Sequence, residues 1–208
     1  TNNIMSSTIQ GRFACLVSCG TNVLDLLIAD NITFNCRIAI ITAGRRITVN
    51  GNKGTWSGIE FISSFGTIAD LIISGNELEF GRILVTQSGQ LIVDVLIEGN
   101  NIARHSLNTE FGLQCRNASR AVIDGNFVHE CQGGGIAVEG GEFSCIGNRS
   151  DGNGLGGNVT AGMREAYYFA CTSGFVGYGR VQSNTARTHP GYAYYFLSPQ
   201  NVDFVDNF

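Results

Sequence analysis

Short apolar runs recur along this chain, and each ends in an asparagine that commonly follows glycine, as in LIISGN at Leu71–Asn76 and VLIEGN at Val95–Asn100. The asparagines in this position are Asn31, Asn52, Asn76, Asn100, Asn126, Asn148, Asn184 and Asn207. Their successive spacings are 21, 24, 24, 26, 22, 36 and 23 residues. A period of this size indicates a solenoid, in which each repeat forms one coil stacked on the next.

The pattern within each repeat predicts strands rather than helices. Apolar and polar residues alternate, as in Gly135–Glu139, and β-branched residues dominate. The 28 glycines interrupt the chain too often for long helices, and the leucine-rich repeat consensus is absent. We therefore predict one all-β domain over residues 1–208, a right-handed, single-stranded parallel β-helix of about eight coils spaced about 4.8 Å apart.

Each predicted coil holds three strands. A first strand leads through a turn into a second strand that ends at the asparagine, and a short third strand follows, such as Glu77–Phe80 or Phe127–Glu130. The first strands are Gly58–Ile62, Arg82–Thr86, Gly112–Arg116, Gly135–Glu139, Ala166–Ala170 and Tyr192–Leu197. Asparagine and glycine suit a left-handed bend, and stacked asparagines can form a hydrogen-bonded ladder.

In this arrangement the chain, from about Gly11 to Phe208, resembles the right-handed β-helix superfamily of pectate lyases, polygalacturonases, alginate epimerases and bacteriophage tailspikes. The catalytic motifs of the lyases and polygalacturonases are absent. The Asp-Pro-His signature of the epimerases is also missing, because His189-Pro190 lacks the aspartate. The resemblance implies the fold and a polysaccharide ligand along the outer side of the first strands, and tailspikes are the most similar members.

Alignment of the first strands predicts which side chains point outward. One outward column holds Glu60, Leu84, Gln114, Ala137, Tyr168 and Tyr195, and the next holds Thr86, Arg116, Glu139, Ala170 and Leu197. Inward positions are Leu113, Cys115, Ile136, Val138, Tyr167, Phe169, Tyr194 and Phe196. Tyr168 and Tyr195 then become neighbours, which suits sugar stacking, a subunit interface or incidental surface. Arg116 and Glu139 also become neighbours, and a plain surface ion pair is the alternative there.

Two loops flank these columns. The spacing of 36 places about a dozen extra residues in Asp151–Glu165, and a smaller expansion covers Arg104–Glu110. Long loops on a regular scaffold are where function concentrates. We predict a saccharide-binding groove that contains Gln114, Arg116, Glu139 and Tyr168, with Tyr195 and His129 as further substrate-binding residues.

Cleavage of a glycoside needs two carboxyl groups. Glu139 is the predicted general acid, with Asp151 or Glu165 as its partner, and Glu110 is a further candidate. Glu79, His129, Asp151 and Arg187 share one column of the third strands. His129 and Asp151 are one coil apart in it, close enough to act as a base and its orienting carboxylate. Ordinary solvated polar side chains are the alternative interpretation.

Composition and charge limit the classes of molecule that the chain is expected to bind. A net charge of −4 argues against nucleic acid and mildly against anionic membranes, and no apolar stretch is long enough to span a bilayer. Seven cysteines, with Cys115, Cys145 and Cys171 predicted to be buried, indicate free thiols and folding in a reducing cytosol. Cys15 and Cys19 lack a neighbouring histidine, so no metal site and no cofactor are expected.

These observations predict a carbohydrate-binding β-helix on a virion tail or outside the cell, and they leave open whether it also cleaves the carbohydrate as a hydrolase or lyase. A non-catalytic structural or receptor-binding β-helix of a virion or adhesin is the alternative. A homo-oligomer, preferably a trimer, is expected because outward positions such as Leu84 and Leu197 are apolar. The chain stops in mid-coil after Asn207, so we expect a fragment of a longer polypeptide.

Overall fold

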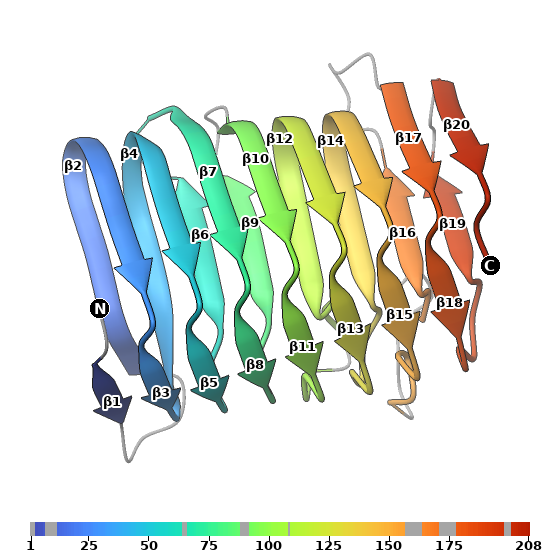
Figure 1. The fold of residues 1–208 in the computed structure, drawn as a ribbon, viewed down its shortest axis with the longest axis horizontal. Coiled ribbons are helices and arrows are strands. Elements are labelled where there is room, and N and C mark those ends of the chain that lie inside the picture. Colours follow the sequence, from blue (N-terminus) through green and yellow to red (C-terminus); the bar gives the residue numbers. More distant parts are fainter. Residues whose placement is uncertain are drawn as a thin grey trace.

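The computed structural model describes residues 3–6, 12–63, 66–87, 92–107, 109–156, 164–170, 178–197 and 201–208. These residues form a parallel β-solenoid of about seven turns and, within the described ranges, contain strands and no helix. Figure 1 shows the coils side by side along the long axis, with the two ends of the chain at opposite ends of the stack. The prediction of an all-β repeat with about eight coils is confirmed.

The third strands of the coils form an eight-stranded sheet. Its strands are β1 (Ile4–Ser6), β3 (Ile32–Phe34), β5 (Lys53–Thr55), β8 (Glu77–Glu79), β11 (Asn101–Ala103), β13 (Phe127–His129), β15 (Arg149–Asp151) and β18 (Thr185–Arg187). Every adjacent pair is parallel. The sheet therefore places each short strand directly beside its counterpart in the next coil.

The first and second strands form a twelve-stranded sheet. Separate first strands are β6 (Ile59–Ser63), β9 (Ile83–Gln87), β16 (Tyr167–Ala170) and β19 (Tyr194–Leu197). Separate second strands are β7 (Ile68–Ser74), β10 (Ile92–Glu98), β17 (Tyr178–Gln182) and β20 (Asn201–Val205). In four coils both strands are continuous, as β2 (Arg12–Ala29), β4 (Cys36–Asn50), β12 (Leu113–Asp124) and β14 (Ile136–Ile146).

The interior is a set of stacked columns. Ile73, Ile97 and Ile123 pair in register and are fully buried. Toward the C-terminal coils the core becomes aromatic. Tyr167 stacks on Tyr194 with ring centroids 4.9 Å apart, and Phe169 stacks on Phe196 at 5.1 Å. The predicted inward set is thus confirmed, and the same period that fixes the fold also fixes which side chains face out.

The asparagine ladder runs through the described coils. Asn100 is typical: its Nδ2 donates to Asn126 Oδ1 (2.9 Å) and to the carbonyls of Ile73 and Glu98, while its Oδ1 accepts from Asn76 Nδ2 (2.9 Å). Asn3 extends the ladder by one member beyond the eight predicted from sequence. The left-handed backbone lies at the residue before each ladder asparagine, such as Gly99 (φ 60°), rather than at the asparagine.

A second left-handed corner follows each third strand, four residues after the ladder asparagine. Its members are Asn35, Trp56, Phe80, Arg104, Glu130, Gly152 and Thr188. For this reason β8 and β13 end one residue earlier than predicted, before Phe80 and Glu130. These corners turn the chain into the next first strand and hold the side chains that border the outer face of the first strands.

Candidate functional site

The predicted pair of tyrosines lies on the outer side of the first strands. Tyr168 of β16 pairs in register with Tyr195 of β19, and their rings stack with centroids 5.6 Å apart and planes within 9° of parallel. The ring of Phe111 lies 5.7 Å from that of Tyr168. Both tyrosines are partly exposed. They form an apolar strip with hydroxyl groups, which is the kind of surface that a sugar ring stacks on.

A polar cluster adjoins this strip. Arg116 of β12 donates from Nε to Glu139 Oε1 of β14 at 2.8 Å. With its oxygen turned to the guanidinium, the Gln114 amide accepts from Arg116 at 2.6 and 2.7 Å. Burial, and after it the Glu139 carboxylate, raise the pKa of Tyr168. We call Gln114, Arg116, Glu139, Tyr168 and Tyr195 the tyrosine face.

Part of the predicted outward column is not exposed. Glu60 is 6% exposed, Gln114 4% and Ala137 0%. Arg37 and Arg82 contact Glu60, Arg116 contacts Gln114, and the buried Phe111 packs close to Tyr168, the neighbour of Ala137 in the next coil. The glycines at 133 and 134 make room for the chain at Phe111, because a Cβ on Gly134 would lie 2.2 Å from the Phe111 ring.

The residues predicted on the third strands lie on a different sheet from the tyrosine face. His129 of β13 pairs in register with Asp151 of β15, as predicted. However, Asp151 accepts from Arg149 at 2.8 Å, and His129 stacks on Phe127 with its Nε2 3.2 Å from Asn101 Oδ1. Each group therefore takes another partner, and burial lowers the pKa of His129.

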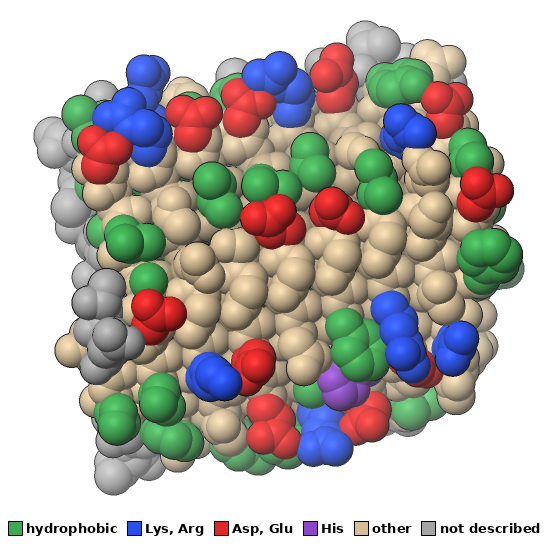
Figure 2. All heavy atoms as spheres, viewed as in Figure 1, with side chains coloured by type: hydrophobic (Ala, Val, Ile, Leu, Met, Phe, Trp, Pro, Cys, Tyr) green, Lys and Arg blue, Asp and Glu red, His purple; other side chains and the backbone are tan. Residues whose placement is uncertain are grey.

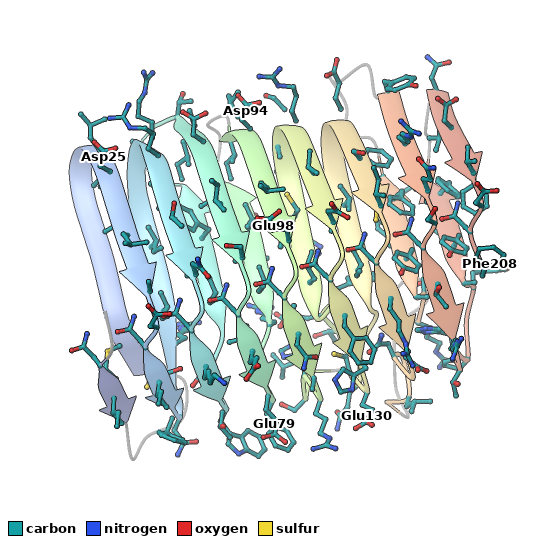
Figure 3. The ribbon with its side chains drawn as sticks, viewed as in Figure 1. Asp25, Glu79, Asp94, Glu98, Glu130 and Phe208 are labelled. Carbon is teal, nitrogen blue, oxygen red and sulfur yellow. The ribbon has the colours of Figure 1, made fainter. Side chains whose placement is uncertain are left out.

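The described face of the second and third strands carries its charges mainly along two edges (Figure 2). Along one edge, Arg104 lies between Glu79 (2.8 Å) and Glu130 (2.7 Å), two residues that project from the same edge in Figure 3. Along the other, Arg120 pairs with Asp94. These are exposed ion pairs of the kind that contribute under about 1 kcal/mol each.

Glu165 lies in the bend before β16 and is 4% exposed. Its Oε2 accepts from the backbone N–H of Arg164 at 2.9 Å. Residues 157–163 of the predicted loop lie outside the described residues. The structure thus brings Glu139 together with Arg116, Gln114 and Tyr168, and it separates Glu139 from Asp151 by placing them on different sheets.

A second cluster was not predicted as a site. Glu60, whose side chain is 8% exposed, accepts from Arg37 (2.5 Å) and from Arg82 (3.2 Å). Arg82 also pairs with Glu110, and Glu110 Oε2 lies 3.2 Å from His105 Nε2. This chain of contacts fastens the 104–112 segment onto β6 and β9. The sequence pattern singles out Glu60 and Glu110 individually, but it does not reveal their partners.

A groove of about 460 Å³ opens beside this cluster. Trp56 and Phe80 form part of it, with ring centroids 4.2 Å apart and planes within 8° of parallel. Its polar and apolar lining also includes Glu60, Arg82, His105 and Leu107. We call this the Trp56 groove. A signal for it is present in the sequence, since Trp56 and Phe80 both stand four residues after a ladder asparagine.

Acid should weaken the attachment of the 104–112 segment. The hydrogen bond from His105, together with the charge of Arg82, lowers the pKa of Glu110 from 4.5 to about 2. Because the folded-state pKa is depressed, the stabilisation is present above about pH 5 and is lost as the pH falls through about 2. We expect Glu110→Gln to cost about 2 kcal/mol at pH 7, a value reduced for partial exposure. Urea unfolding of both proteins at pH 7, 4 and 2.5 measures this, and a pH-independent difference would refute it.

Within the described residues no group of three or more His, Cys, Asp or Glu side chains is arranged to hold a metal ion. No described helix is long and apolar enough to cross a membrane. Cys36, Cys115, Cys131 and Cys145 are buried free thiols, and burial raises the pKa of Cys115 to about 12. The other three cysteines lie where side chains are not described.

Comparisons of the chain with protein-family models, curated proteins and solved structures gave no match. The fold and the site geometry therefore carry the functional argument. They define a parallel β-solenoid with an asparagine ladder and an aromatic, polar outer face.

Proposed function

We propose that this chain is a saccharide-binding β-solenoid whose ligand lies along the tyrosine face. The observation that carries the proposal is the partly exposed Tyr168–Tyr195 stack directly beside the Gln114–Arg116–Glu139 cluster. The ring faces and edges that this stack leaves free can contact pyranose rings, and the partly exposed Arg116 guanidinium and Glu139 carboxylate supply a donor and an acceptor for hydroxyl groups. The strip covers the two adjacent coils of β16 and β19, which gives room for more than one sugar ring.

We favour binding over cleavage. Glycoside hydrolysis needs a second carboxyl group within about 10 Å of the first across the scissile bond. Asp151 projects from the other sheet and is paired with Arg149, and Glu165 is buried in a bend. On the first-strand face Glu139 is paired with the Arg116 guanidinium. This observation supports the receptor-binding alternative over a hydrolase or lyase.

We further propose that the chain resembles a pectin-lyase-like tailspike and recognises a bacterial surface polysaccharide. We also propose that it forms a homo-oligomer, preferably a trimer, on a virion tail or outside the cell. The exposed apolar side chains of Phe34 on β3 and Val122 on β12, on coils within the stack, support contact with other chains. Light scattering on the purified chain tests this part, and a monomer at high concentration contradicts it.

Removing a ring from the strip should weaken saccharide binding. We expect Tyr168→Ala to raise the Kd for a bacterial oligosaccharide, first identified on a glycan array, at least about tenfold, a loss of about 1.4 kcal/mol. Tyr168→Phe retains the ring and should lose less. Tyr178→Ala removes an exposed tyrosine from a second strand and should change nothing.

Calorimetry of the four proteins makes the measurement, and mass spectrometry of the same samples reports cleavage. Equal affinities for wild type and Tyr168→Ala would contradict the proposed site. Shortened products would restore the enzyme interpretation, with Glu139 as the first carboxylate to replace.

A further inference from the structure

The Trp56 groove presents an aromatic surface in an unusual backbone setting. Trp56 (φ 55°) and Phe80 (φ 55°) both lie in the left-handed corner after a third strand. A bulky residue in this conformation is a genuine outlier, costing roughly 1–2 kcal/mol. Glycine occupies the same corner at Gly152. The corner is left-handed in the other described coils as well, so the distinctive feature here is two aromatic side chains in succession.

The two rings stack with their centroids 4.2 Å apart, and Trp56 stays 40% exposed at the groove. Leu107, half exposed, contributes to the lining from the 104–112 segment. The corner therefore places the indole of Trp56, one face of which is covered by Phe80, at a hollow of about 460 Å³.

The polar lining contains an unsatisfied atom. His105 has a side chain only 7% exposed, and its Nδ1 is buried without a hydrogen-bond partner. With Nε2–H donated to the ionised Glu110, Nδ1 is left as an acceptor. An unsatisfied buried polar atom costs about 1–3 kcal/mol, and a ligand hydroxyl would recover this cost if a turn of the imidazole brought Nδ1 to the groove.

The charges of the lining limit the ligand further. Glu60 is paired with Arg37 and Arg82, and Glu110 with Arg82. The two guanidinium groups are therefore already matched by two carboxylates. An anionic ligand would meet Glu60 and Glu110 without an uncommitted cation, whereas a neutral, hydroxyl-rich ligand could bond to both carboxylates and to His105.

We propose that the Trp56 groove is a second binding site, specific for a neutral pyranose that stacks on Trp56. This site is separate from the tyrosine face: it lies on the coils of β4, β6 and β9, whereas Tyr168 and Tyr195 belong to β16 and β19. It does not require the proposed function, because none of its residues belongs to the tyrosine face.

The chain has one tryptophan, so its fluorescence reports on this groove directly. Methyl glucopyranoside, methyl galactopyranoside, methyl mannopyranoside and glucuronate are titrated at millimolar concentrations into the full chain. We expect a saturable change in Trp56 emission with at least one neutral glycoside and a Kd at least about tenfold weaker for glucuronate. No saturable change with any neutral glycoside, or tighter binding of glucuronate, overturns the proposal.

Two variants locate the effect. Phe80→Ala removes the ring that supports Trp56 and should weaken the neutral glycoside at least about tenfold. Tyr168→Ala should leave the fluorescence titration unchanged, even if it abolishes binding of a longer saccharide. If Tyr168→Ala instead removes the Trp56 response, the two sites are one and the proposal of a second site is wrong. Circular dichroism confirms that each variant is folded.

Discussion

Replacing Asn100 by alanine should destabilise the solenoid by about 4 kcal/mol, a large part of the roughly 5–15 kcal/mol that holds a typical domain. The Asn100 side chain is buried and donates to Asn126, Ile73 and Glu98 while accepting from Asn76. Alanine leaves these groups without a partner in a place that water does not reach. Each unsatisfied buried group costs about 1–3 kcal/mol, and not all of them will remain unsatisfied after relaxation. Urea unfolding measures the change.

Two further variants separate hydrogen bonding from packing. Asn100→Asp keeps the volume but turns a donor amide into a carboxylate that faces three acceptor oxygens, so it should cost at least as much as alanine. Asn101→Ala changes the exposed neighbour, whose Oδ1 contacts the His129 ring at the surface. Its cost should stay under about 1 kcal/mol. A cost for Asn100→Ala as small as that of Asn101→Ala would show that the ladder does not stabilise the stack.

Gly81→Ala should be the second most damaging change, at about 3 kcal/mol or more. A Cβ at this position would lie 1.5 Å from the carbonyl oxygen of Ser57 and 2.6 Å from its carbon. Backbone would have to move, since no flexible side chain is available to give way. The displaced turn holds Ser57 beside Trp56 and leads into Arg82, so the emission of Trp56 should shift as well.

The matched control is Gly99→Ala. Gly99 has φ +60°, and no atom lies within 4 Å of the place that a Cβ would take. Alanine at this position should lower the free energy of unfolding by only about 1 kcal/mol, the cost of placing a Cβ in the left-handed conformation. Thermal unfolding of both variants compares a steric clash with backbone strain alone. Equal losses in the two variants would contradict the close approach of the coils at Gly81.

The repeat made the fold readable from the sequence. A fixed interval between asparagines gives the coil, and the apolar phase before each one gives the inward face, as at Ile97 and Ile123. These features depend only on contacts between neighbouring coils, so the repeat pattern of the sequence is enough to predict them. The same pattern correctly placed Tyr168 beside Tyr195 and Arg116 beside Glu139.

The parts that depend on loops could not be read in this way. Glu110 is fastened to Arg82, which also pairs with Glu60, and these contacts join residues with no periodic relation. Burial on the outer face therefore differs from coil to coil. The left-handed corner at Trp56 could not be predicted from the sequence for another reason. The equivalent positions in the other coils include glycine, asparagine, aromatic and charged residues, so they show no consensus.

The saccharide site can be located in a crystal structure of the chain soaked with an oligosaccharide that binds on a glycan array. We expect sugar density along β16 and β19, with a pyranose ring against Tyr168 or Tyr195 and hydroxyl contacts to Arg116 or Glu139. Ligand density confined to the sheet of the third strands, with both tyrosines uncovered, would contradict this expectation.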